Sequence, residues 1–168
     1  LKADKQVSNI EDMITKGVDA IILTPISPTA VIPVLKKAEA KGIKIVLLAS
    51  SIKSDDYDAL VTVDDVDFGK AGAEWLAEKL DGKGKIVQIS GQPGYTTAIE
   101  RAKGFEDRLP EVCPDVELME TQPGDWNREK SQRVMESFLV KYDQIDGVYA
   151  GDDNMGVGAL NAAKAAGR

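Results

Sequence analysis

The stretch AIILTPISPTAVIPVLKKAEAKGIKIVLLAS, residues 20–50, decides the fold class of this chain. It opens with the short apolar run 20–23, which is typical of a buried strand. Apolar residues then recur at helical spacing and predict a helix from 29 to about 41, which Gly42 ends. A second apolar run follows at 43–48. Two continuously apolar strands joined by a helix indicate a parallel sheet that is covered on both faces.

The remainder of the chain repeats this alternation. A helix with apolar positions from 7 to 14, followed by Gly17 as its stop signal, precedes the quoted stretch. Further strands are predicted at 60–63, 85–89, 116–119 and 147–150. Further helices are predicted over 68–80, 98–109 and 127–142, and a last helix runs to Gly167. Pro110 is expected to break the helix 98–109, and Asn127 to cap the helix that follows it. Alternating strands and helices predict a doubly wound α/β fold.

Composition excludes several classes of function. The 168 residues carry a net charge of −7 and no basic cluster, which argues against nucleic acid and against an anionic membrane surface. The chain has no histidine and one cysteine, so Ser-His and Cys-His catalysis and zinc sites of the Cys/His type are excluded. We expect no catalytic residue, no metal and no cofactor, and we interpret Cys113 as an inert thiol in a loop.

Polar residues gather where the predicted strands end. In open α/β sheets, ligands bind outside the carboxyl ends of the strands. Those positions hold TPIS (24–27), ASS (49–51), DD (64–65), SGQPG (90–94), QPGDWN (122–127) and GDD (151–153). The glycines of 90–94 are a weak signal for phosphate, because no GK[ST] sequence follows them. The acidic pairs could in principle hold Mg²⁺, but no strand-end lysine accompanies them.

These positions suit a neutral polyol better. Such a ligand needs charged and amide groups for its hydroxyls and an aromatic face for its C–H side. Asp152 accepts hydrogen bonds, Arg101 donates them, Asn127 and Gln92 do either, and Trp126 supplies the aromatic face. The alternatives are that Trp126 only anchors a loop and that Arg101 only pairs with a neighbouring Glu100 or Asp107.

Two adjacent carboxylates stand before the last predicted helix. We expect Asp153 to cap that helix, because Asn154 would then begin it, and Asp152 to point from the strand end toward a ligand. The alternative is that both carboxylates are solvated.

Six stretches of the chain, taken in order, resemble one known family. They are GVDAIILTPISPTAV (17–31), KGIKIVLLASS (41–51), VDDVDFGKAGAEWLAEKL (63–80), GKIVQISGQPGYTTAIERAKGF (84–105), QPGDWNREKSQRVM (122–135) and YAGDDNMGVGALNAAKAAGR (149–168). Together they resemble the periplasmic sugar-binding proteins of ABC transporters, ribose-binding-like and of type I fold. The resemblance covers nearly all 168 residues.

The resemblance implies two doubly wound lobes with a hinge and a ligand cleft between them. Residues 1–63 would form part of the N-terminal lobe and residues 64–168 part of the C-terminal lobe. Asp64 and Asp65 would lie at the hinge. The family has a strand and a signal sequence before the position of Leu1 and further strands after that of Arg168, so both lobes are expected to be partial.

Family ligand positions carry over by motif to six residues, namely Thr24, Ala49, Gln92, Arg101, Trp126 and Asp152. Arg101 and Trp126 match the family pattern. Ala49 stands where an aspartate is common, and Thr24 and Asp152 stand where ribose binders have asparagine. The resemblance therefore implies a ligand other than ribose, such as another pentose, a polyol or a small furanose.

The leading hypothesis is a secreted, monomeric solute-binding protein that delivers a sugar or polyol to an ABC permease. It would be periplasmic or lipid-anchored on the outer face of the cell membrane, and it would not be an enzyme. The alternative is the effector-binding core of a lac-repressor-like transcriptional regulator, which shares the fold. A receiver-like or nucleotide-using enzyme is a third class.

Overall fold

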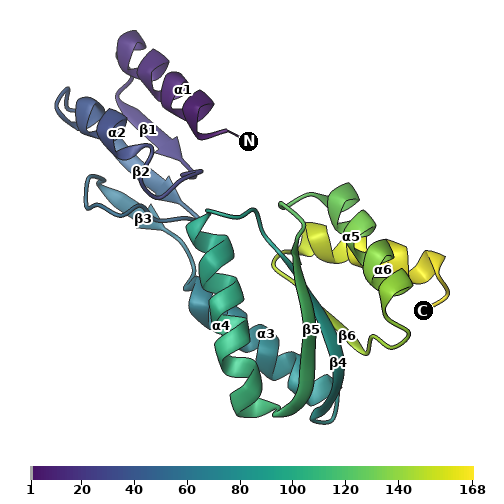
Figure 1. The fold of residues 1–168 in the computed structure, drawn as a ribbon. Helices are drawn as coiled ribbons and strands as arrows, with labels where there is room; N and C mark the ends of the chain where they lie inside the picture. The colour runs from purple at the N-terminus through teal and green to yellow at the C-terminus, as the bar shows by residue number, and fades with distance from the viewer. Residues whose placement is uncertain (1) are drawn as a thin grey trace. The chain divides into compact units, whose positions relative to one another are not determined.

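The computed structural model describes residues 2–168, and these residues divide into two compact units. The first comprises the chain up to Val63 together with Gly94–Thr97, and the second comprises Asp64–Pro93 and Ala98–Arg168 (Figure 1).

The first unit is a three-stranded sheet with two helices. Its elements are α1 (Ala3–Lys16), β1 (Ala20–Leu23), α2 (Ile32–Glu39), β2 (Lys44–Leu48) and β3 (Ala59–Val61). The strands are parallel in the order β1-β2-β3. Gly17 ends α1 with a φ of 68°, a conformation that glycine adopts without strain.

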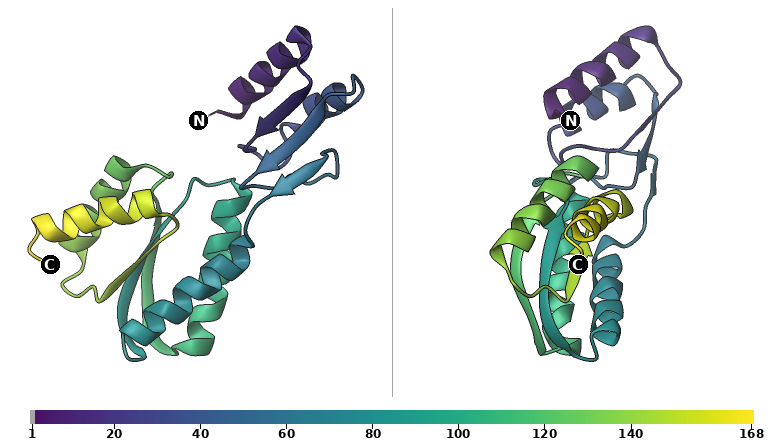
Figure 2. Two further views of the ribbon diagram at one scale, coloured as in Figure 1. Left: turned by 180° about the vertical axis from the view of Figure 1, so that it is seen from behind. Right: turned by 90° about the vertical axis from the view of Figure 1, so that its right-hand side faces the viewer.

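Helices α1 and α2 cover the same face of this sheet (Figure 2). Ile21 and Leu23 of β1 pack into the core with Ile10 of α1 and Leu35 of α2, whereas Ile22 between them is 63% exposed. The continuous apolar run had predicted that both faces are covered. Within residues 2–168, helices cover one face of this sheet, so that prediction is wrong for the described part of this unit.

The second unit is a three-stranded parallel sheet between two pairs of helices. Its elements are α3 (Asp65–Lys79), β4 (Lys83–Ser90), α4 (Thr96–Val112), β5 (Asp115–Pro123), α5 (Arg128–Lys141), β6 (Gly147–Ala150) and α6 (Asp153–Ala165). The strand order is β5-β4-β6. Helices α3 and α4 lie on one face of the sheet and α5 and α6 on the other (Figures 1 and 2).

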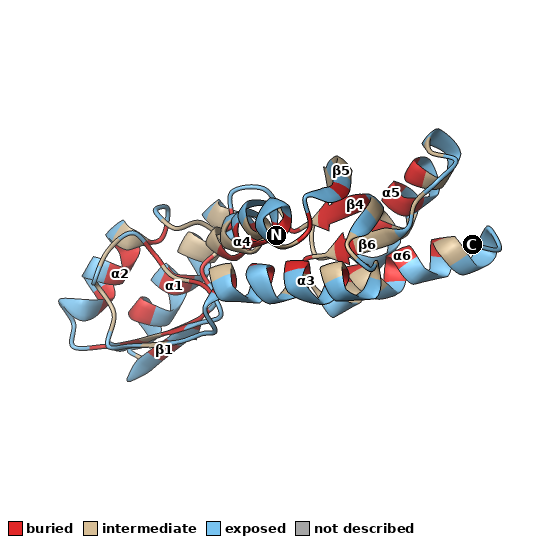
Figure 3. Ribbon diagram, turned by 90° about the horizontal axis from the view of Figure 1, so that it is seen from below, coloured by how far each residue is buried: buried red, intermediate tan, exposed pale blue. Residues whose placement is uncertain are grey.

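The central strand β4 supplies the core on both faces. Ile86 packs with Phe105 of α4, while Val87 and Ile89 pack with Phe138 of α5. Residues 86–89 are all buried, and Figure 3 shows the buried colour on β4. Here the strand is covered on both faces, as expected of a central strand in a parallel sheet.

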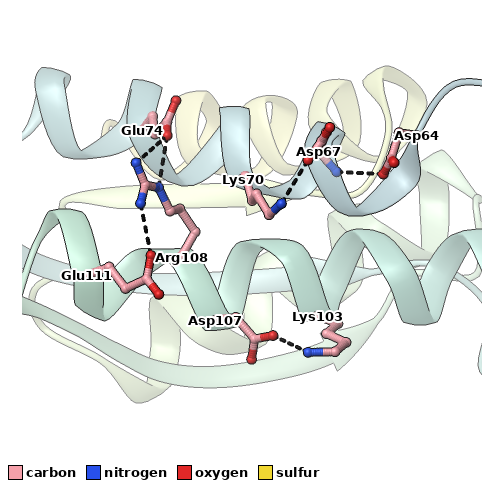
Figure 4. Close-up of polar contacts among 8 residues, drawn as sticks. All are labelled: Asp64, Asp67, Lys70, Glu74, Lys103, Asp107, Arg108 and Glu111. Atoms are coloured by element: carbon pink, nitrogen blue, oxygen red, sulfur yellow. Dashed lines mark hydrogen bonds and ion pairs between the residues drawn. The ribbon is translucent and has the colours of Figure 1, made fainter.

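Ion pairs lie on the exposed surfaces of α3 and α4 (Figure 4). Arg108 bonds Glu74 across the two helices and Glu111 within α4. Lys70 bonds Asp67 at 2.8 Å, and Lys103 pairs with Asp107. Exposed pairs of this kind add little stability, because water and salt screen them.

The prediction that Pro110 breaks its helix is wrong. Helix α4 continues past Pro110 to Val112, because a proline in the last turn removes only one amide hydrogen from the ladder. The amide of Cys113 still donates to the Leu109 carbonyl at 2.9 Å. Cys113 lies in the loop between α4 and β5, as predicted, with its side chain buried in the core, and burial raises the pKa of its thiol. Among residues 2–168, no helix has the length and apolar character to cross a bilayer.

Candidate functional site

The strand order of the second unit creates a topological switch point at the carboxyl end of β4, which is the candidate site. The chain leaves β4 toward β5 on one side and then crosses to β6 on the other. Parallel sheets bind ligands where successive connections run in opposite directions in this way. The loops after the three strands also meet here, since Gly124 N donates to Ser90 O at 2.8 Å and Gly151 N donates to Ile89 O at 3.0 Å.

The indole of Trp126 lies across the ends of β4 and β6. A Cβ atom on Gly91 would fall 2.0 Å from the indole, and one on Gly151 would meet the ring at 3.5 Å. Glycine at 91 thus lets the ring approach the backbone closely, because any larger residue would occupy the same space. The sequence had marked Gly91 only as part of a possible phosphate loop.

Unusual backbone conformations hold Trp126 in place. Asp125 and Trp126 have φ values of 54° and 59°, in the left-handed region that non-glycine residues rarely adopt. Asn154 Nδ2 donates to Trp126 O at 3.1 Å. Asn127 Oδ1 accepts from Lys130 N at 2.8 Å, which confirms the predicted cap of α5. Such strain persists where surrounding contacts fix it, and it is common at ligand sites.

Arg101 is anchored by two hydrogen bonds. Its Nε donates to Asp65 Oδ1 and its Nη1 donates to the Gly151 carbonyl, each at 2.7 Å. The guanidinium carbon also lies 4.2 Å from the centre of the Phe68 ring and 6.0 Å from that of Trp126. The interpretation of Arg101 as a surface partner of Glu100 or Asp107 is wrong, since its carboxylate partner is the buried Asp65.

The two acidic residues at the start of α3 have separate roles. Asp64 is exposed and caps the helix, its Oδ1 accepting from Asp67 N at 2.9 Å. Asp65 is only 4% exposed and belongs to the Arg101 pair. Sequence reasoning placed both at the hinge and did not find this pair. The signal available was an acid at the first helical position, which is too common to reveal a partner 36 residues away.

The expected division of labour between Asp152 and Asp153 is wrong. Asp152 is the cap of α6, with an extended backbone and with Oδ1 accepting from Met155 N at 2.7 Å. Asp153 is the first residue of the helix and is exposed. The helix begins one residue earlier than predicted, because Asp153 already has helical geometry. The cap uses one oxygen of Asp152, which is half-buried at the end of β6.

Two buried polar side chains lie within the sheet of the second unit. Tyr149 and Gln88 are register partners on β6 and β4, and within residues 2–168 neither the Tyr149 hydroxyl nor the Gln88 amide nitrogen has a hydrogen-bond partner. Burial raises the pKa of Tyr149 to about 12, an effect that the charge of Arg101 opposes and that of Asp65 reinforces. Tyr149 stacks on Phe105 with ring centres 3.9 Å apart. Sequence reasoning missed both side chains, which read as interior strand positions.

The remaining ligand candidates lie in both units of the chain. Gln92 is half-buried in the loop after β4. Thr24 is exposed in the first unit, where its carbonyl accepts from Gln6 Nε2 at 2.8 Å. Ala49, at the end of β2, has a φ of 59°. The structure thus brings Arg101 and Trp126 together beside Gly151 and describes Thr24 and Ala49 in another unit.

The side chains at this candidate site are suited to hydrogen bonding and stacking. Arg101 supplies directed donors, Asp152 supplies a carboxylate, and Trp126 supplies an apolar face. Among residues 2–168, no three His, Cys, Asp or Glu side chains gather so as to hold a metal ion. These groups fit a compact ligand that has hydroxyls on one side and C–H bonds on the other.

Known proteins match this chain along its length. The family model described as "Periplasmic binding protein domain" matches residues 1–168. The xylitol-binding protein of Mycolicibacterium smegmatis is 35% identical over 164 residues, which cover 97% of this chain and 47% of that protein. The galactofuranose-binding protein of Escherichia coli is 36% identical over 173 residues, which cover 99% of this chain and 54% of that protein.

A solved structure agrees in fold as well as in sequence. The periplasmic binding protein of the arabinose ABC transporter from Shewanella sp. ANA-3, bound to arabinofuranose, superimposes with a TM-score of 0.92 at 33% identity. The match covers 99% of this chain and 56% of that one. The chain spans about half the length of the relatives that it matches. The family match and the parallel α/β sheets confirm the predicted fold class, and the chain belongs to the periplasmic binding protein family.

Proposed function

We propose that this chain forms part of an extracytoplasmic solute-binding protein that captures a neutral sugar or polyol and delivers it to an ABC permease. The observation that carries the proposal is the guanidinium of Arg101, fixed beside the indole of Trp126 at the carboxyl end of β4. A donor with fixed direction next to an aromatic face suits the two sides of a sugar ring.

The proposed protein has two lobes, which in this chain are residues 1–63 and 64–168, and a ligand cleft between them. Asp64 and Asp65 are proposed to lie near the hinge, because the division between the two compact units falls at Val63 and Asp64. Thr24, Gln92 and Asn127 are proposed as further ligand contacts. The protein is proposed to act as a monomer in the periplasm or anchored by lipid outside the membrane.

The proposed ligand is a pentose other than ribose, a polyol or a small furanose. The departures at Thr24, Ala49 and Asp152 from the ribose pattern support this choice. The relatives named for xylitol and galactofuranose and the structure bound to arabinofuranose support it as well. These relatives are binding proteins by name, which favours solute capture over a transcriptional regulator and over an enzyme.

A thermal-shift screen of sugars and polyols tests the proposal. The protein is the full-length polypeptide that contains this chain, because the chain spans about half the length of the relatives that it matches. A ligand that binds only the native state raises the unfolding midpoint. We expect a rise with a pentose, furanose or polyol, followed by one-to-one binding in calorimetry and an unchanged ligand by NMR after hours. A flat screen, or turnover of the ligand, would overturn the proposal.

A further inference from the structure

The pair formed by Asp65 and Arg101 is the least exposed ion pair found among residues 2–168. Its side chains are 4% and 17% exposed, whereas those of the neighbouring pair Asp67–Lys70 are 67% and 46% exposed. Removing two charges from water is costly and is offset only by close pairing and further hydrogen bonds. A buried pair beside the candidate site therefore calls for an explanation other than stability.

The contacts of Arg101 fix the plane of its guanidinium. Asp65 takes the Nε hydrogen, the Gly151 carbonyl takes a hydrogen from Nη1, and the Phe68 ring lies against the guanidinium carbon at 4.2 Å. Within the described chain, Nη2 makes no hydrogen bond. With the hydrogen of Nε and one of Nη1 engaged, the second hydrogen of Nη1 and both hydrogens of Nη2 are left to donate to a ligand.

Acidic groups lie on the Asp65 side of this cation. Asp65 pairs with Arg101 directly. Glu100 lies near enough to Asp65 and Asp64 that burial and both of their charges raise the pKa of its carboxyl group. The charge of the guanidinium is therefore compensated by Asp65, although Arg101 keeps its hydrogen-bonding capacity.

We propose that Asp65 is a positioning and selectivity residue, which aims Arg101 at ligand hydroxyls and cancels its charge so that the site takes neutral sugars and rejects anionic ones. This inference rests on the proposed function and deepens it. Without Asp65, the guanidinium would be a mobile and uncompensated cation, which attracts carboxylates and phosphates.

The test compares ligands that differ in charge. The affinities of D-galactose and D-galacturonate, and of xylitol and D-xylonate, are measured by calorimetry for the full-length polypeptide and for Asp65→Asn. We expect the wild-type protein to favour the neutral member of whichever pair binds. Asp65→Asn should shift the ratio of affinities toward the anion by about tenfold or more, in a manner that weakens with salt. A variant that lost affinity only through poor folding would weaken both members alike.

Asp67→Asn is the matched control, because it removes one exposed carboxylate from the same helical turn and should leave the ratio unchanged. Asp65→Glu restores the charge and should restore the preference for the neutral ligand. An unchanged ratio in well-folded Asp65→Asn overturns the inference while leaving the proposed function standing. If Asp65→Asn does not fold, the wild-type protein alone tests the inference. Wild-type protein that binds the anion more tightly than the neutral ligand, with an affinity that falls as salt is added, would show that the guanidinium is not compensated, and this result would overturn the inference. Failure of every neutral ligand to bind would instead count against the proposed function.

Discussion

The Nε atom of Arg101 lies 2.7 Å from Oδ1 of Asp65, which joins the fourth helix of the chain to the first turn of the third. The same guanidinium reaches the Gly151 carbonyl at the end of β6. One side chain thus connects three elements of the second unit at the carboxyl end of its sheet.

Replacing Arg101 with alanine should weaken both binding and folding. Loss of charge-assisted hydrogen bonds worth about 1.5–3 kcal/mol predicts an affinity that is lower by about 10- to 150-fold. The carboxylate of Asp65 would remain buried without its partner, which should cost about 3 kcal/mol of unfolding free energy. Urea denaturation checks the second effect, and the double variant with Asp65→Asn should recover part of it. Equal stability of wild type and Arg101→Ala would contradict this account of the pair.

Replacing Gly91 with alanine should displace the indole of Trp126. The added Cβ would fall 2.0 Å from the ring, so we expect a loss of about 1–3 kcal/mol in stability together with weaker ligand binding. Gly156→Ala in α6 is the control. Its added Cβ would lie 3.8 Å from the nearest atom, the Cβ of Ala150, and alanine favours a helix. Urea denaturation and calorimetry of both variants separate local crowding from a general effect of losing a glycine.

Shortening Trp126 should reduce affinity in proportion to the aromatic surface that is lost. Trp126→Phe keeps a smaller ring for the ligand to stack on, whereas Trp126→Ala removes the ring altogether. We expect the alanine variant to bind more weakly than the phenylalanine variant in calorimetric titration, with circular dichroism as the folding control. The reverse order would show that the indole serves the loop and not the ligand.

The two aspartates before α6 should respond differently to alanine. Asp152→Ala removes the oxygen that accepts from Met155 N and should cost about 1 kcal/mol of stability. Asp152→Asn keeps an acceptor and should cost less. Asp153→Ala changes an exposed residue with no capping bond, so chemical denaturation should show a smaller loss there than for Asp152→Ala. A larger loss of stability for Asp153→Ala would instead indicate that Asp153 caps the helix.

Acid should remove a stabilising contribution from Glu120. Hydrogen bonds from Lys141, Gln122 and Tyr142 lower the pKa of this carboxyl group from its usual 4.5 to about 2. Because the folded pKa is depressed, the contribution is complete above about pH 4.5 and is lost as the pH falls toward about 2. The stability difference between wild type and Glu120→Gln in urea should therefore shrink over that window. A difference independent of pH would contradict the assignment.

Local sequence patterns predicted most elements of the fold. Residues 147–150 form a strand with the predicted bounds, and the cap at Asn127 and the glycine stop at Gly17 are confirmed. These features depend on neighbours within a few residues, which a sequence displays directly. Pro110 was misread because the cost of proline depends on its distance from the end of the helix, and that end lies at Val112.

The site was less predictable because it depends on contacts between distant segments. Arg101 and Trp126 were proposed from their positions at strand ends, yet the pairing of Arg101 with Asp65 follows from how α3 and α4 pack. The left-handed backbone at Asp125 and Trp126 is fixed by surrounding contacts and leaves no local mark. The cap of α6 was missed by one residue, because either of two adjacent aspartates satisfies the same pattern.

The burial of Cys113 makes its thiol a probe of how often the core of the second unit opens. It is the single cysteine of the chain, so an alkylating reagent can label each molecule at most once. Its thiol is packed between α4 and β5 with a raised pKa, and reagent reaches it as a thiolate only when that part of the core opens. The rate of labelling therefore counts openings of the core, in the way that exchange of a protected amide hydrogen does.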